Sequence, residues 1–346
     1  MFMPQTFGSS DQYYSVNQTG LIQAEKRPLT ELEKRFAQFL DRYDPQLTET
    51  VERAFKKWNN VIRDCLRAET AFRLTVGEDT QAVPVRVQDG LPAPFAEVLR
   101  QFDPREWDLL LNRAVLGQST SGIQFLLDRF RQISEWEPIK PCPAQFEEVH
   151  HTGILLATII EELQKLQLLK QIRTIERDIL GAYFFRVPEI HLYWMVIGFF
   201  AGYLAVPVEA LTVVVAAHEL AHAYTHLGRD IDGDRWNTQA FAEADAGIVE
   251  GLAQFYAEVV SEKLMGRFPE VLHAYKELLG FQSGPYTVHK DWKVSDEAAG
   301  EVVRISMVRC RSNRVKALDD FNSMRAQHLE QLKKRRPKQD ASKKAD

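Results

Sequence analysis

The segment 213–228 constrains this chain most, because it carries the pattern His-Glu-x-x-His at His218, Glu219 and His222. On an α-helix, residues four apart lie on one face about one turn apart, so the two imidazoles can converge on a single metal ion. The carboxylate of Glu219 is then offset to one side of that ion, where it can act as a base on a water molecule. The segment therefore predicts a helix that supplies two zinc ligands and a general base.

The bounds of this helix are also marked in the sequence. Pro207 suits the first turn, Glu209 places negative charge near the helix N-terminus, and Gly228 is typical of a helix end. The five-residue pattern alone arises by chance in many unrelated proteins. A zinc site therefore needs a third ligand elsewhere in the chain.

The best candidate for that ligand lies in the segment Gln239–Lys263, which has the pattern of a second long helix. Glu250 lies there on a face of small side chains, where another helix can approach closely. Its neighbours at three and four residues are Ala246, Gly247, Ala253 and Gln254. Glu243, two turns earlier on nearly the same face, is the rival, whereas Asp245 points elsewhere.

Other histidines and acidic residues are weaker candidates. His226 continues the four-residue spacing, but eight residues of helix rise about 12 Å, and zinc–nitrogen bonds are about 2 Å long. His218 and His226 therefore cannot share one ion, and we expect His226 to line the site or bond the following loop. That loop, residues 229–234, lacks the spacing of a calcium-binding loop and indicates turns instead. Adjacent His150 and His151 point about 100° apart on a helix and are not expected to be ligands.

Two motifs together resemble those of the gluzincin zinc metallopeptidases, and more distantly of aminopeptidase N-like enzymes. They are His218-Glu-Leu-Ala-His222 and, further on, Val249-Glu-Gly-Leu-Ala-Gln-Phe255. In that family a His-Glu-x-x-His helix is followed by a helix that supplies a glutamate. The resemblance implies that His218, His222 and Glu250 hold Zn²⁺.

The chain also departs from the family in informative ways. Twenty-seven residues separate His222 from Glu250, more than in aminopeptidase N-like enzymes, and no Gly-x-Met-Glu-Asn motif is present. Aminopeptidase activity is therefore not implied. Gln254 stands where the thermolysin-like branch has an aspartate that supports a ligand histidine. Thr225 and Gly228 occupy positions where metzincins have Gly and His.

Gluzincins commonly use a tyrosine or histidine from beyond the zinc helices to donate a hydrogen bond to the oxyanion. By this resemblance, Tyr286 and His289 in the turn-rich segment 281–292 are both candidates. The sequence does not decide between them.

Periodicity along the rest of the chain predicts an α+β protein, mostly helical, with a zincin-like metallopeptidase domain and an N-terminal helical region. The expected division is residues 1–26 as a flexible arm, 27–140 as the helical N-terminal region, 141–332 as the catalytic domain and 333–346 as a basic disordered tail. The expected helices lie at 28–40, 47–66, 94–101, 104–116, 121–133, 144–180, 298–308 and 314–332, with a short strand at 82–87.

Two further strands are expected at Gly181–Val187 and Ile190–Ile197, just before the zinc helix. An edge strand beside a metal can pair with an extended peptide through main-chain hydrogen bonds. Alternatively, both strands simply cover the core. The apolar run Leu192–Val208 approaches the length of a membrane span, but Pro207 and Glu209 interrupt it, so we expect a buried strand and a lead-in to the helix.

Composition narrows the setting. A net charge of -5 indicates no overall nucleic-acid affinity, and three widely spaced cysteines argue against a disulfide framework. The N-terminal sequence has neither the cationic leader nor the apolar core of a cleaved secretion signal. These features favour a cytoplasmic location.

The leading hypothesis is a zinc-dependent peptidase that acts on a peptide or protein substrate, with Glu219 as general base. The alternative is a catalytically silent zincin-fold binding or scaffold protein, whose metal serves stability. Its partner contacts would come from the N-terminal helical region or the basic tail. The presence of Glu219 speaks against this alternative, because a structural zinc site has no use for an adjacent base.

Overall fold

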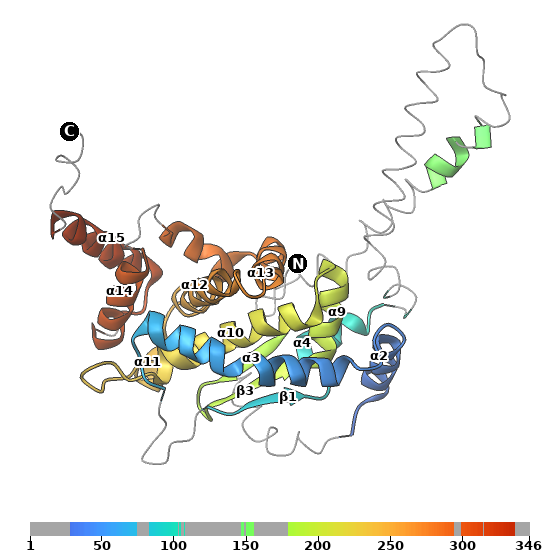
Figure 1. Ribbon diagram of the computed structural model, residues 1–346, viewed down its shortest axis with the longest axis horizontal. Coiled ribbons are helices and arrows are strands. Elements are labelled where there is room, and N and C mark those ends of the chain that lie inside the picture. Colours follow the sequence, from blue (N-terminus) through green and yellow to red (C-terminus); the bar gives the residue numbers. More distant parts are fainter. Residues whose placement is uncertain are drawn as a thin grey trace, which may run out of the picture.

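The computed structural model describes residues 28–74, 83–102, 104, 107, 147–148, 150–155, 179–293, 299–313 and 315–335. They form a mostly helical protein with one small mixed sheet (Figure 1). In chain order the elements are α2 (Glu31–Asp41), α3 (Leu47–Thr70), β1 (Val85–Gln88), α4 (Ala93–Leu99), β2 (Gly181–Phe184), β3 (Glu189–Tyr193), α9 (Trp194–Leu204), α10 (Val208–Leu227), α11 (Thr238–Ala242), α12 (Ala246–Leu264), α13 (Glu270–Phe281), the 3₁₀ helix η1 (Gly284–Trp292), α14 (Ala299–Asn313) and α15 (Leu318–Arg335).

The two N-terminal helices form where the sequence predicts them. Thr30 caps α2 in a reciprocal arrangement with Glu33, and the second carboxylate oxygen of Glu33 accepts a hydrogen bond from the backbone N–H of Leu91. The α3 helix buries one stripe of side chains at helical spacing and ends at Ala71, which adopts a left-handed conformation. Both helices thus cover the core through one face.

The sheet has the strand order β1-β3-β2, with β1 parallel and β2 antiparallel to β3. The predicted strand Ile190–Ile197 is wrong beyond Tyr193, because α9 begins at Trp194. Nearly every residue of α9 is buried, so its sequence is apolar on all sides. Periodicity does not separate a short buried helix from a buried strand in such a run.

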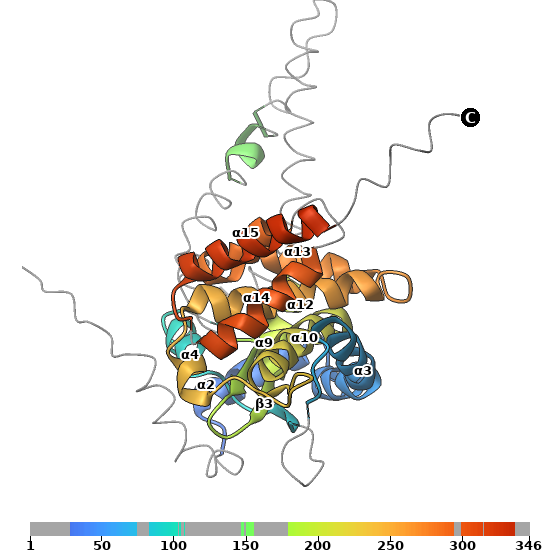
Figure 2. The same cartoon turned by 90° about the vertical axis from the view of Figure 1, so that its left-hand side faces the viewer.

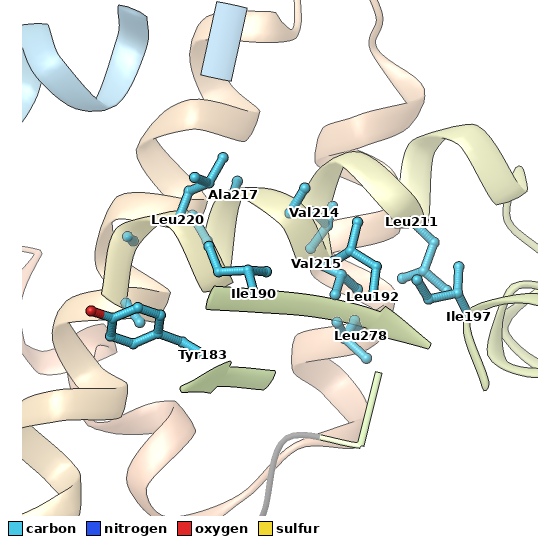
Figure 3. Packing of buried hydrophobic residues seen from close by; sticks show 14 of the residues in the cluster. Tyr183, Ile190, Leu192, Ile197, Leu211, Val214, Val215, Ala217, Leu220 and Leu278 are labelled. Carbon is cyan, nitrogen blue, oxygen red and sulfur yellow. The ribbon is translucent and has the colours of Figure 1, made fainter. Parts of the chain in front are cut away.

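The metal helix predicted from the sequence is α10, and it runs through the centre of the protein. One side of it lies on the sheet, where Ile190 of β3 faces Ala217 and Leu220, and Leu192 faces Val214 and Val215 (Figure 3). Its other sides contact α3, α12 and α13 (Figure 2). All residues from 210 to 227 are buried, as expected for a helix enclosed by other elements.

Both ends of α10 lie where the sequence predicts them. Gly228 was expected as a typical helix-ending residue, but the structure requires glycine there for lack of space. Pro207 immediately precedes the helix, and Gly228 follows its last residue. Gly228 has φ of -57°, so it is not a left-handed cap. A Cβ at this position would lie 2.3 Å from the carbonyl oxygen of Tyr224 and 2.8 Å from Cβ of Phe72. The glycine therefore permits close packing.

Elements from both sides of the expected domain boundary share one sheet and one core. The β1 strand pairs in parallel with β3, matching Val85 with Ile190, and α3 packs along α10. The buried hydrophobic side chains of both parts belong to one cluster. The boundary near residue 140 lies outside the described residues, and the parts described on its two sides contribute to one sheet and one hydrophobic cluster.

Several expected segments fall wholly or mostly outside the described residues. These are the arm, the helices at 104–116 and 121–133, and most of the helix at 144–180. The helix expected at 144–180 does not reach Leu180, because residues 179 and 180 form a bend before β2. The α15 helix extends to Arg335, so the first residues of the expected basic tail are helical, and the rest lie outside the described part. No helix within the described part is long and apolar enough to cross a membrane.

Candidate metal centre

Three side chains from two helices converge at the centre of the protein. His218 and His222 lie one turn apart on α10, and Glu250 reaches them from α12, which packs against α10. The potential ligand atoms of the three residues all lie within 4.8 Å of one another. The structure thus brings together the three residues that the sequence predicts as metal ligands, and the described residues contain no other group of this kind.

The separations within this group match a tetrahedral zinc site. Nε2 of His218 and Nε2 of His222 are 3.1 Å apart, and Oε2 of Glu250 lies 3.3 Å and 3.2 Å from them. Two ligands on a tetrahedral zinc with bonds of about 2.0–2.1 Å are about 3.3 Å apart. A hydrogen bond between the imidazoles accounts for only one of the three distances. Ion pairs with Glu250 would account for the other two, and a single bound ion would be compatible with all three.

The group is largely shielded from water. The exposed fractions of the side chains are 8% for His218, 3% for His222 and 19% for Glu250. Oε2 of Glu250 is itself buried and has no hydrogen-bond partner in the described part of the protein. A buried carboxylate oxygen without a hydrogen bond is costly unless a cation compensates it. This arrangement fits a metal ion held on the two imidazoles and Glu250.

Glu250 is positioned by a helix that begins later than the sequence predicts. The expected single helix over 239–263 is wrong, because α11 ends at Ala242 and α12 begins at Ala246. Asp245 starts α12 by accepting a hydrogen bond from the backbone N–H of Gly247, at 2.7 Å. Glu250 therefore lies in the second turn of a capped helix.

The break in the helix separates Glu243 from the site. Glu243 lies between the two helices, where its side chain accepts hydrogen bonds from Lys316 and Gln239. The bond from Lys316 contributes most to lowering the pKa of Glu243. Glu243 does not belong to the three-residue group, so the structure places the favoured candidate there and leaves out its rival.

Glu219 lies on α10 next to the first ligand and is 1% exposed. It is not one of the three converging residues, as expected for a base beside a metal. Its carboxylate lies against the backbone of β2. A Cβ added at Gly181 would be 2.8 Å from both Cγ and Oε1 of Glu219, and 2.9 Å from Cγ1 of Val215. The absence of a side chain at Gly181 therefore makes room for the Glu219 carboxylate.

This contact predicts that Gly181→Ala destabilises the protein, by about 1–3 kcal/mol in free energy of unfolding, because the new methyl group overlaps Glu219 and Val215. Urea unfolding measures the change. Gly280→Ala is the matched control, since nothing lies within 4 Å of its added Cβ. The control is expected to keep or slightly raise stability, because alanine favours helix. Equal stability of the two variants would contradict the predicted overlap.

His226 does not join the metal group, in agreement with the helix geometry. Its Nδ1 lies 2.9 Å from the hydroxyl of Tyr183, and its Nε2 lies 3.2 Å from the hydroxyl of Thr238, just beyond the loop. Burial, with nearby Arg235 and Arg311, lowers the pKa of His226 to about 3, so the imidazole is neutral. His226 therefore links the end of α10 to β2 and to α11.

Tyr183 is a residue that the sequence analysis missed. It points from β2 toward α10 (Figure 3), and its ring is nearly parallel to the imidazole of His222, at an interplanar angle of 7° and a centroid distance of 6.3 Å. Gly181 and Tyr183, two residues apart, thus face the base and a ligand from one side of the strand. The only sequence signal was the strand itself, whose pairing partner and facing helix the local pattern does not specify.

The two candidates for oxyanion stabilisation lie in different surroundings. The ring centroid of Tyr286 is 6.0 Å from that of His218, so η1 brings this phenol beside the metal group. His289 is fully buried, and its Nε2 lies 2.8 Å from the hydroxyl of Tyr275 and 3.4 Å from Oε2 of Glu258. The structure therefore places Tyr286, and not His289, next to a predicted ligand.

The remaining candidates have structural surroundings. Gln254 donates a hydrogen bond to Gln282, at 2.9 Å. In the loop after α10, Asp230 accepts hydrogen bonds from the backbone N–H groups of Asp232 and Asp234, which is turn chemistry. His150 and His151 are exposed and are not part of the metal group.

Comparisons with protein families, with curated proteins and with solved structures found no match to this chain. The functional argument consequently depends on the residues of the site and their geometry.

Proposed function

We propose that this protein is a zinc-dependent peptidase of zincin-like architecture. The observation that carries the proposal is the set of three nearly equal separations, 3.1, 3.2 and 3.3 Å, among His218, His222 and Glu250, with the carboxylate of Glu219 on the same helix. Two imidazoles and one carboxylate form a ligand set typical of catalytic zinc, which leaves one position for water or substrate. Bound there, zinc would supply Lewis-acid activation of water and of the scissile carbonyl.

The residues around the ligands can carry the remaining steps of amide hydrolysis. Glu219 would take a proton from the attacking water and return it to the leaving nitrogen. The phenol of Tyr286, whose ring lies beside that of His218, would donate a hydrogen bond to the oxyanion. Together they divide proton transfer and charge stabilisation between two elements, α10 and η1.

The β2 strand offers a way to hold the substrate. Among the described strands β2 pairs only with β3, so its other edge has no strand partner there. An extended peptide can pair with such an edge through main-chain hydrogen bonds, without a requirement for a particular sequence. Because Gly181 of β2 touches Glu219, a peptide on this edge would bring its amides close to the base.

The scaffold alternative draws on one specific observation, the low exposure of the ligand side chains. A structural zinc site, however, is normally closed by four protein ligands. The group here has three members within the described part of the chain. A fourth protein ligand, detected by X-ray absorption on the zinc-loaded protein, would favour the scaffold.

Removal of the metal tests the proposal. The full chain, loaded with zinc, is expected to cleave members of a broad peptide library, as detected by mass spectrometry, and chelation is expected to abolish the cleavage. Zinc added back should restore it, whereas magnesium should not, because Mg²⁺ prefers octahedral oxygen ligands. Cleavage that persists after complete zinc removal would contradict a zinc mechanism. Zinc binding without any cleavage would favour the alternative, a catalytically silent scaffold protein.

A further inference from the structure

The η1 helix is fixed to α12 by close packing. A Cβ at Gly251 of α12 would lie 2.6 Å from both Trp292 and Val288 of η1, so these two side chains fill the space that the glycine leaves. The indole N–H of Trp292 also donates a hydrogen bond to Asn322 of α15, at 3.0 Å. The packing anchors the second half of η1.

A buried polar network adds a second anchor, centred on His289. This side chain is fully buried, with its Nε2 2.8 Å from the hydroxyl of Tyr275 on α13 and 3.4 Å from Oε2 of Glu258 on α12. Lys293, just after η1, lies 2.8 Å from Glu258 and 2.7 Å from Glu262. The network therefore joins η1 to two helices.

Glu258 is the negatively charged member of this network. Burial raises the pKa of Glu258, but the hydrogen bonds from His289 and Lys293 outweigh it, so the pKa is lowered overall. The ionised carboxylate accepts hydrogen bonds, so Glu258 ties His289 and Lys293 to α12. The hydroxyl of Tyr275 also donates a hydrogen bond to the carbonyl oxygen of Gln254, at 3.4 Å.

These contacts direct His289 away from the metal group. Glu258 follows Glu250 by eight residues of α12, a rise of about 12 Å along the helix axis. Tyr286 precedes His289 by three residues, and side chains three apart in a 3₁₀ helix lie on one side of it, about 6 Å apart along the axis. Fixing His289 at Glu258 thus fixes the position of Tyr286, whose ring lies near His218.

We propose that His289 is a positioning residue, which holds η1 on Glu258 and Tyr275 so that the phenol of Tyr286 stays beside His218. This inference rests on the proposed peptidase function. It gives different roles to two residues that sequence reasoning treated as equivalent oxyanion donors. His289 acts through Tyr286 and does not touch the substrate.

A double-mutant cycle on the full-length, zinc-loaded protein tests the inference. His289→Leu is expected to lower kcat by about 10²-fold, close to the loss from Tyr286→Phe, with little change in KM. The double variant should be no slower than Tyr286→Phe alone, because His289 has nothing left to position. Multiplied losses in the double variant would show that His289 contributes independently, and would overturn the inference.

Hydrogen exchange provides a readout that does not depend on activity. In His289→Leu, the amides of residues 284–292 should exchange about tenfold faster, since a buried hydrogen bond to a charged group has been lost. His289→Gln, which retains a donor, should restore most of the protection and most of the activity. His273→Leu is the control, because His273 is 59% exposed on α13. Unchanged exchange in His289→Leu would overturn the inference.

The two readouts separate the possible failures. Zinc content is measured on every variant, and it is expected to equal that of the wild type. Absence of hydrolysis by the wild type would overturn the peptidase proposal. The exchange result would then still decide whether His289 holds η1 in place.

Discussion

Glu219→Gln is expected to keep zinc bound and to lower kcat/KM by about 10²- to 10⁴-fold, the usual contribution of a general base. Glutamine has nearly the same shape as glutamate but cannot take a proton from water. Zinc should remain because Glu219 is not one of the three converging ligands. Peptide cleavage by mass spectrometry and zinc analysis of the same purified sample measure the two effects.

A matched variant controls for loss of charge alone. Glu243→Gln removes an exposed carboxylate that binds Lys316 outside the site, so neither cleavage nor zinc content should change. Undiminished turnover in Glu219→Gln would exclude Glu219 as the base. Loss of zinc together with activity would instead indicate that Glu219 helps to hold the metal.

Glu250→Ala is expected to weaken zinc binding by more than about 100-fold. Removing a hydrogen-bond partner of a ligand typically costs about 10- to 100-fold in metal affinity, and removal of the ligand itself should cost more. The alanine variant leaves two imidazoles, which cannot complete a three-ligand site. Competition with a fluorescent zinc chelator measures the affinity.

Glu243→Ala is the matched control for this measurement, because it tests the rival ligand from the same part of the sequence. Its zinc affinity should equal that of the wild type, since α11 ends before Glu243 and the side chain binds Lys316. Equal losses of zinc affinity in the two variants would not identify either glutamate as the third ligand. A larger loss in Glu243→Ala would contradict the geometry of the site.

The convergence of the two histidines could be predicted from sequence because their spacing is a local property of helices. His218 and His222 are brought together by a single helical turn, whatever surrounds the helix. Glu250 required an additional signal, its setting among small residues that let two helices approach. Glu250 lies in the group as predicted even though the predicted helix start was wrong. The break between α11 and α12 moves Glu243 away from the site, whereas Glu250 remains in the second turn of α12.

The parts that could not be predicted depend on contacts between distant segments. Nothing near Val85 in the sequence indicates that it pairs with Ile190. The contact of Gly181 with Glu219 likewise exists only once β2 lies on α10. His289 could not be distinguished from Tyr286, because their difference lies in a hydrogen bond from another helix, α13. Sequence patterns report local geometry, and these features are tertiary.

The parallel pairing of β1 with β3 also sets an order of events during synthesis of the chain. Val85 leaves the ribosome about one hundred residues before its partner Ile190. The α3 helix is likewise synthesised well before α10, against which it packs. Non-local pairing of this kind slows folding and leaves apolar surface exposed meanwhile. Because Glu250 follows all of these elements in the sequence, the three-residue group cannot assemble until each of them has been synthesised.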